Sequence, residues 1–302
     1  MLKNEKNLIT KFINHLEIER RLSPLTCKHY RRDIEALYQY CRKSKIDLWK
    51  DLNCEHIRDY SAKSYRNGLS SRSIQRRLSA TRTFFRYLLR EKHVNKNPVE
   101  SVTAPKSDKR LPENIDADRM AKLLDIKGDG PIFFRDHAIL ELLYSCGLRL
   151  GELTNLNLND IDFLDKTVHA HGKGNKDRIL PIGQYAIHAI KKWRSERHKL
   201  AKNNEKALFV SSRGKRLSAR SVQSRISHWA KQQGIDSKVY PHLFRHSFAT
   251  HLLESSHDLR GVQELLGHAN ISTTQVYTHL DFQHLAQIYD QTHPRAKKRK
   301  NK

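Results

Sequence analysis

The sequence predicts a mainly α-helical chain of two domains, with a small β-hairpin in the second domain. Three observations support this fold class. Residues 1–105 carry apolar side chains at helical spacing almost throughout. Three prolines then follow at Pro98, Pro105 and Pro112, a spacing that is typical of an extended linker. Beyond them, two short strand-like runs flank the glycine- and lysine-rich turn at 172–176.

Four helices are predicted in the first domain, which we place at residues 1–103. The first helix occupies the N-terminal stretch. The second begins at Ser23-Pro24, because a serine can cap a helix and a proline fits its first turn. The third is predicted at 56–65, and the fourth begins after Ser71. Together they form a four-helix module.

The second domain is predicted to be mixed. It occupies 113–290, after a linker at 104–112 and before a basic tail at 291–302. One predicted helix ends at Gly147, where a glycine can adopt the left-handed conformation that closes helices. The strands are predicted at 166–171 and 178–182, and the helices at 116–125, 136–146, 184–201, 218–232, 242–254, 258–266, 272–277 and 281–290.

Charge is the most informative global property. The 302 residues include 57 lysines and arginines and 32 acidic residues, which gives a net charge of +25. Residues 1–105 contribute +12 and the remainder +13, so the excess is not confined to a tail. Two basic domains on a linker suit a clamp around a polyanion. This favours a nucleic acid over an anionic lipid as the partner, whereas charge alone hardly separates DNA from RNA.

The fourth predicted helix carries five arginines: Arg72, Arg76, Arg77, Arg82 and Arg86. Such a run is often only a solvated face. Here four of the arginines follow the apolar stripe at helical spacing, which favours contact with phosphates. The residues that we expect to contact the nucleic acid are Arg72, Arg76, Arg77 and, in the hairpin turn, Lys176.

Several classes of protein are disfavoured. There is no apolar run of about 18 residues, the length that a transmembrane helix needs. The N-terminus lacks the apolar stretch of a signal peptide. The four cysteines are scattered, so a reduced cytoplasmic chain is expected rather than a disulfide or zinc framework.

Candidate chemistry lies in the second domain. Arg149 follows the helix end at Gly147, where an arginine can direct its fork at a phosphate. His242 and Arg245 are three residues apart and share a helix face. Tyr277 is expected near the end of a short helix. A phenol with a pKa of about 10 needs cationic neighbours and a base to attack phosphorus.

A zinc site is the alternative for the histidines of this helix. His242 and His246 have the four-residue spacing of a zinc-binding helix. No glutamate lies between them and no acidic third ligand is evident, so we predict no metal and no cofactor. His246 and His251 are expected to be structural, hydrogen-bonded within the domain.

Together these pieces resemble the tyrosine recombinase family, also known as the phage integrase family. The order arginine, lysine, histidine-x-x-arginine, histidine, tyrosine is specific to it. The resemblance extends into the first domain through LSPLT and LSATRTFFRYL. In the second domain it is carried by GLRLGEL, HGKGNKDRILPIG, HLFRHSFATHLLESS, LRGVQELLGHANISTTQVYTHLDFQHLA and HPRAKK.

The resemblance implies a covalent mechanism of DNA strand exchange. The tyrosine is the nucleophile, and the two arginines stabilise the transition state. Lys173 protonates the leaving 5′-oxygen. His242 assists proton transfer, and His268 hydrogen-bonds the phosphate. The product is a 3′-phosphotyrosyl DNA, formed without ATP or metal. The implied catalytic set is Arg149, Lys173, His242, Arg245, His268 and Tyr277.

The resemblance also implies partners. Within the family it is strongest to recombinases that resolve chromosome dimers at cell division. The implied partners are double-stranded DNA with a dif-like site, the sister recombinase XerD in a heterotetramer, and the translocase FtsK as activator. The segment 281–302 is expected to dock on the neighbouring subunit through its first half. The alternatives are a phage or integron integrase, a type IB topoisomerase, and a DNA-binding protein that has lost catalysis.

Three residues depart from the family pattern. Gly151 stands where serine is usual, and we expect it to be a workable helix cap. Phe244 replaces a leucine, and Cys146 replaces a small residue. Repacking can often absorb the first change, and Cys146 is expected to be buried and inert. None of the three is a catalytic side chain, so activity is expected to remain.

Overall fold

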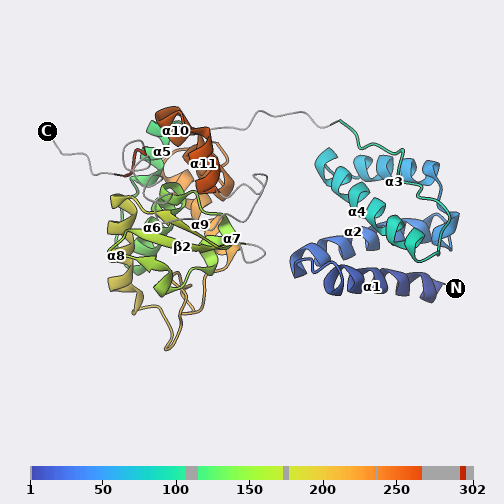
Figure 1. The fold of residues 1–302 in the computed structure, drawn as a ribbon, viewed down its shortest axis with the longest axis horizontal. Helices are drawn as coiled ribbons and strands as arrows, with labels where there is room; N and C mark the ends of the chain where they lie inside the picture. Colours follow the sequence, from blue (N-terminus) through green and yellow to red (C-terminus); the bar gives the residue numbers. More distant parts are fainter. Residues whose placement is uncertain (1, 107–114, 173–176, 236, 267–292, 297–302) are drawn as a thin grey trace. The chain divides into compact units, whose positions relative to one another are not determined.

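The computed structural model describes residues 2–106, 115–172, 177–235, 237–266 and 293–296. The chain divides into two compact units, Met1–Leu111 and Pro112–Lys302 (Figure 1). Helices predominate in both units and the second contains a small antiparallel sheet, so the predicted fold class is confirmed. No described helix is both long and apolar enough to cross a membrane.

The first unit contains the four predicted helices. Ser23 accepts a hydrogen bond from the Thr26 N–H, and Pro24 occupies the first turn, as the local sequence predicts. The cap of the last helix is Ser70, one residue earlier than expected. The elements are α1 (Leu2–Ile18), α2 (Pro24–Lys43), the short 3-10 helix η1 (Trp49–Asp51), α3 (Cys54–Arg66) and α4 (Ser71–Arg90).

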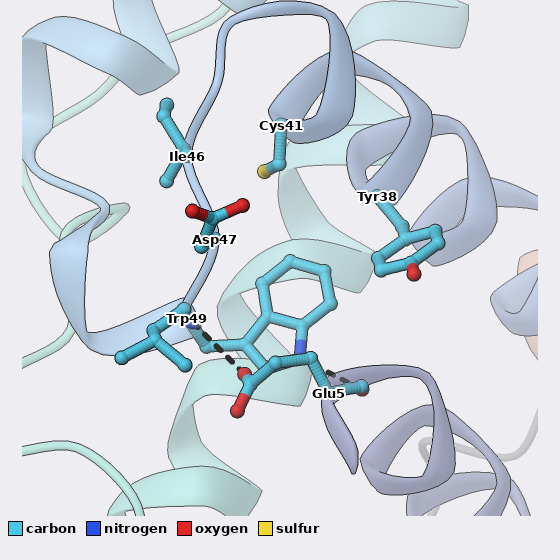
Figure 2. A pocket seen from close by; sticks show the side chains of 7 residues that line it. Glu5, Tyr38, Cys41, Ile46, Asp47 and Trp49 are labelled. Carbon is cyan, nitrogen blue, oxygen red and sulfur yellow. Dashed lines mark hydrogen bonds between the residues drawn. The ribbon is translucent and has the colours of Figure 1, made fainter. Parts of the chain in front are cut away.

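Trp49, on the unpredicted η1, completes the core of this unit. Its ring meets Phe84 edge-on, with 5.1 Å between the ring centroids. Its backbone N–H donates to the Glu5 carboxylate and its indole N–H to the Glu5 carbonyl, both at 3.0 Å (Figure 2). The cavity beside it has a volume of about 10 Å³. That is room for at most one water molecule, so the cavity is a packing feature rather than a ligand site.

The second unit contains a longer series of elements. The helices are α5 (Ala117–Leu124), α6 (Pro131–Cys146), α7 (Leu150–Asn155), the 3-10 helix η2 (Leu158–Asp160), α8 (Gln184–Arg197), α9 (Ala219–Gln232), α10 (Pro241–Ser256) and α11 (Leu259–Leu266). The strands are β1 (Ile161–Asp162), β2 (Thr167–His171) and β3 (Asp177–Pro181). The helices predicted at 272–277 and 281–290 lie outside the described residues.

The central element of this unit is α6. Every residue from Arg135 to Cys146 except His137 is buried, which is typical of a helix surrounded by protein. Burial raises the pKa of the Cys146 thiol to about 12, so this cysteine is inert, as expected. Phe244 of α10 is fully buried in the same core.

The sheet has the order β1-β2-β3 with antiparallel pairing. Ala170 pairs with Arg178, and His171 pairs with Asp177. Because side chains alternate along a strand, the first pair lies on the buried face and the second on the exposed face. The sheet therefore directs one arginine into the domain and presents a histidine and an aspartate outside.

The described residues of the C-terminal segment, 293–296, are bound to this same unit. The Arg295 guanidinium lies 3.1 Å from the buried Glu141 carboxylate and 4.3 Å from the Tyr185 ring centroid. The Ala296 carbonyl accepts from the backbone N–H of Gln184 at 3.2 Å. These residues belong to the basic tail predicted at 291–302, and Arg295 supplies the cation that the buried carboxylate of α6 requires. The rest of the segment expected to dock on a neighbouring subunit, 281–292 and 297–302, lies outside the described residues.

Candidate active site

The site is built where α6 ends and α7 begins. Gly147 has a φ of 57°, in the left-handed region, and ends α6 as the sequence predicts. A Cβ at this position would lie 2.5 Å from Cδ1 of Phe248, so the space also demands a glycine. Arg149 is the N-cap residue of α7. Gly151 is thus the second residue of that helix rather than its cap, which corrects the expectation from sequence.

Replacing Gly147 by alanine is expected to destabilise the second unit by about 2–4 kcal/mol. Both the left-handed backbone and the clash with Phe248 contribute. Urea unfolding of the full chain measures the effect. Gly151→Ala is the matched control, because nothing lies within 4 Å of a Cβ there and the expected effect is a stabilisation of at most about 1 kcal/mol. Equal effects of the two substitutions would contradict this account of Gly147.

Arg245 of α10 is held by two helix ends. Its Nη1 donates to the Gly147 carbonyl at 2.7 Å, and its Nη2 donates to the Leu266 carbonyl at the end of α11. The carbonyl ends of helices carry partial negative charge, which favours a guanidinium there. Nη2 of Arg149 donates to the same Leu266 carbonyl at 3.4 Å. The two predicted arginines therefore converge on a single backbone oxygen.

The buried carboxylate of Glu152 orients Arg149. Oε1 of Glu152 lies 2.9 Å from Nη1 of Arg149, and Oε2 accepts the Arg149 backbone N–H at 2.8 Å. Arg178, from the buried face of β3, binds both carboxylate oxygens at 2.8 Å. Glu152 is only 4% exposed and Arg178 8%. The strand and the two helices are thus joined through one carboxylate.

Two guanidinium groups bind this carboxylate, and a third, that of Arg245, interacts with it electrostatically. Burial, together with the charges of Arg149 and Arg178, lowers the pKa of Arg245 to about 10, so it remains protonated at neutral pH. Burial of Glu152 acts to raise its pKa, but the hydrogen bonds and charge of Arg178 outweigh this and the net shift is downward. The cluster therefore carries a charge of +2 at neutral pH, and its planar forks suit the oxygens of a phosphate.

The other predicted site residues fall into two groups. His242 lies in the first turn of α10, on an exposed position before the buried Arg245. Lys173, Lys176, His268 and Tyr277 lie outside the described residues. Of the histidines expected to be structural, Nδ1 of His251 lies 2.9 Å from the Tyr144 hydroxyl, which confirms that expectation. His246 is half-buried on the same helix, but its buried Nε2 has no hydrogen-bond partner among the described residues, so the hydrogen bond expected for it is not found there.

Sequence reasoning missed Glu152 and Arg178. A signal for the first was present, because a glutamate three residues after a helix cap commonly accepts the cap's backbone N–H. The alternation of Arg178 with its strand neighbours also placed it on the apolar face. What no local pattern indicated is that these two side chains meet, 26 residues apart in the chain.

The arginines of α4 do not form one uniform basic flank. Arg76 and Arg77 both pair with Asp33, a buried carboxylate of α2. Arg82 donates to two backbone carbonyls near the end of the unit, those of Val99 and Val102. Arg72 is exposed. Part of the positive charge predicted for phosphates therefore also stabilises this unit.

The chain is similar to known proteins along nearly its whole length. Residues 113–284 match the Phage integrase family, and residues 9–92 match its N-terminal SAM-like domain. Tyrosine recombinase XerC of Escherichia coli O127:H6 (strain E2348/69 / EPEC) is 47% identical over 292 residues, covering 97% of this chain and 98% of that protein. XerC of Shigella flexneri is similar to the same extent.

Two solved structures share the fold at lower identity. XerH site-specific recombinase, bound to a palindromic difH substrate in a post-cleavage complex, has a TM-score of 0.71 and 22% identity, covering 94% of this chain and 84% of that one. The Tn1549 transposon integrase, in complex with a circular intermediate DNA, has a TM-score of 0.72 and 19% identity, covering 88% and 92%.

Proposed function

Because this chain belongs to the phage integrase family and is a site-specific tyrosine recombinase of the XerC type, we propose which residues carry out its strand exchange. The observation that supports the assignment best is the convergence of Arg149 and Arg245 on the Leu266 carbonyl. Two adjacent guanidinium groups form a site for the non-bridging oxygens of one phosphodiester. The proposed catalytic residues are Arg149, Lys173, His242, Arg245, His268 and Tyr277.

In the proposed reaction, the Tyr277 oxygen attacks the scissile phosphorus. A bond forms between this oxygen and phosphorus, and the bond to the 5′-oxygen of the next nucleotide breaks. His242 assists removal of the phenol proton, and Lys173 supplies a proton to the leaving 5′-oxygen. The two arginines and His268 stabilise the charge on the phosphoryl oxygens in the transition state. Attack by a 5′-hydroxyl reverses these steps, so rejoining needs no ATP.

Glu152 and Arg178 are proposed as positioning residues for this reaction. The carboxylate holds both the side chain and the backbone N–H of Arg149. Arg178 in turn binds both of its oxygens. The geometry of Arg149 therefore depends on β3, the strand that follows the segment containing Lys173 in the sequence.

The proposed substrate is double-stranded DNA with a dif-like site, where the enzyme acts in the cytoplasm in a heterotetramer with XerD. FtsK is the proposed activator, and resolution of chromosome dimers is the proposed role. The net charge of +25, divided almost equally between the two halves, supports a clamp around DNA. The proposed domains are a core-binding domain at 1–103 and a catalytic domain at 113–290.

The proposed DNA contacts of the first domain are on α4. Arg72 is exposed, which supports contact with phosphates, whereas Arg76 is exposed but already paired with Asp33. Arg77 also lies near Asp33, at 4.0 Å, and is half-buried, so its proposed contact is the least favoured of the three by its surroundings. Lys176 of the hairpin turn is the proposed contact in the second domain.

The test of the nucleophile is covalent trapping. The full chain is incubated without metal with a labelled dif-like duplex that is nicked close to the scissile phosphate, and a denaturing gel detects the adduct. Tyr277→Phe is expected to bind the duplex and form no adduct, because its ring has no hydroxyl. Tyr65→Phe, at an exposed tyrosine of α3, is the matched control and is expected to form the adduct normally.

The outcomes separate the alternatives. An adduct with Tyr277→Phe would show that the nucleophile is another residue. If the natural chain binds but forms no adduct alone, XerD is added, and an adduct then shows that the partner is required. Continued absence of an adduct on sites of several sequences would favour a DNA-binding protein without catalysis.

A further inference from the structure

The exposed face of the hairpin gathers two histidines and an aspartate. His169 and His171 are two residues apart on β2, so both imidazoles lie on the same face of the strand. Asp177 of β3 is opposite His171 in the strand register. One ligand atom from each of these three side chains lies within 4.8 Å of the other two.

The distances are close to those of a metal site. Nδ1 of His171 lies 3.0 Å from Oδ2 of Asp177, and the rings of His169 and His171 have centroids 4.9 Å apart. A tetrahedral ion with bonds of about 2.0–2.1 Å holds its ligand atoms about 3.3 Å apart. Rotation of the exposed His169 side chain can bring its ring nitrogen closer to the other two ligand atoms without moving the strands.

A second carboxylate orients one of the imidazoles. Nε2 of His171 lies 3.3 Å from Oδ1 of Asp160, on η2. If Nε2 donates to Asp160, then Nδ1 is the nitrogen that faces Asp177. Histidines that bind metals commonly donate their other ring N–H to a carboxylate in this way, which fixes the tautomer and the ring orientation.

We propose that His169, His171 and Asp177 bind a divalent transition-metal ion of the Zn²⁺ class on the exposed face of the hairpin, with Asp160 orienting His171. Two imidazoles and one carboxylate favour such an ion over Mg²⁺, which prefers oxygen ligands in an octahedral arrangement. Three protein ligands leave further positions for water. The site goes beyond the proposed strand exchange and does not depend on it.

The site lies on the opposite face of the sheet from the catalytic cluster. Asp177 and Arg178 are consecutive on β3, so their side chains point to opposite faces, and Arg178 is the one that reaches Glu152. A bound ion would link β2 to β3 at the last residue pair before the turn. It would therefore stabilise the folded second unit in proportion to its binding.

The test uses the full chain without a histidine tag, freed of metal by a chelator. Zn²⁺ affinity is measured by competition with a chromophoric chelator, and Co²⁺ is added separately to observe the absorption of a bound ion. One Zn²⁺ per chain is expected, together with a higher midpoint of thermal unfolding and no competition from Mg²⁺. Asp160→Asn is expected to weaken Zn²⁺ binding about tenfold or more.

His169→Ala is the decisive variant, because the ion pairs of His171 with Asp160 and Asp177 do not include it. It is expected to weaken Zn²⁺ binding by at least tenfold with an unchanged thermal midpoint in the absence of metal. His188→Ala, at an exposed histidine of α8, is the matched control and is expected to bind Zn²⁺ normally. Unchanged affinity in His169→Ala, or an equal loss in His188→Ala, would overturn the proposal.

Discussion

Replacing Arg245 by lysine is expected to slow formation of the covalent adduct by about a hundred- to a thousandfold. Arg245 binds the carbonyls of Gly147 and Leu266 through two separate nitrogens, beside the guanidinium of Arg149. Lysine has one nitrogen and no planar fork, so it cannot hold both helix ends and also contact a phosphate oxygen. Single-turnover trapping on the nicked duplex measures the rate, and a gel-shift assay measures DNA binding, which is expected to change little.

A matched arginine exists in the first unit. Arg82 also donates to two backbone carbonyls, those of Val99 and Val102, through one half-buried side chain. Arg82→Lys therefore makes the same chemical change in the unit that contains none of the proposed catalytic residues, and it is expected to reduce stability without slowing the adduct step. An unchanged rate in Arg245→Lys, or an equal loss in Arg82→Lys, would show that Arg245 does not contact the reacting phosphate.

Replacing Glu152 by glutamine is expected to destabilise the second unit by about 3–5 kcal/mol, because it removes the one carboxylate among three guanidinium groups. Adduct formation is also expected to slow, since an amide NH2 replaces one of the two oxygens that Arg149 binds and cannot accept from it. Urea unfolding measures the stability. The matched control is Glu91→Gln, which breaks the exposed pair with Arg90 and is expected to cost less than about 1 kcal/mol.

The effect of Glu152→Gln should depend on pH in a defined direction. The pKa of Glu152 in the folded chain lies below its ordinary value of 4.5, so the unfolded chain binds the proton more readily. The stabilisation that ionised Glu152 provides is therefore fully present above the ordinary pKa of 4.5. It is lost as the pH falls through the lower pKa of the folded chain. The difference between natural chain and variant should be constant from pH 7 to pH 5 and shrink in stronger acid. A difference that grows in acid would mean that Glu152 is not ionised in the folded chain.

The local elements of this protein follow from short stretches of sequence. Ser23-Pro24 starts α2 and Gly147 ends α6, as predicted. These signals are readable in the sequence because a helix cap or a left-handed glycine affects only the backbone within a few residues of it. The hairpin strands likewise follow from alternating side chains around a glycine-rich turn. The two arginines proposed as catalytic were predicted from motifs that are local and specific. The same motifs also name Lys173, His268 and Tyr277, which lie outside the described residues.

Contacts between residues far apart in the sequence could be identified only from the folded structure. The pairing of Arg76 with Asp33, of Glu152 with Arg178, and of Arg295 with Glu141 joins segments separated by 43, 26 and about 150 residues. A charged residue on a helix has the same local signature whether it is solvated or paired, and burial alone distinguishes the two cases. Sequence therefore established most of the described helices, the hairpin and the family, whereas packing established which charges remain available for DNA and which are neutralised inside each unit. The reason is that a buried charge must find its partner across the fold, and no local spacing encodes where that partner is.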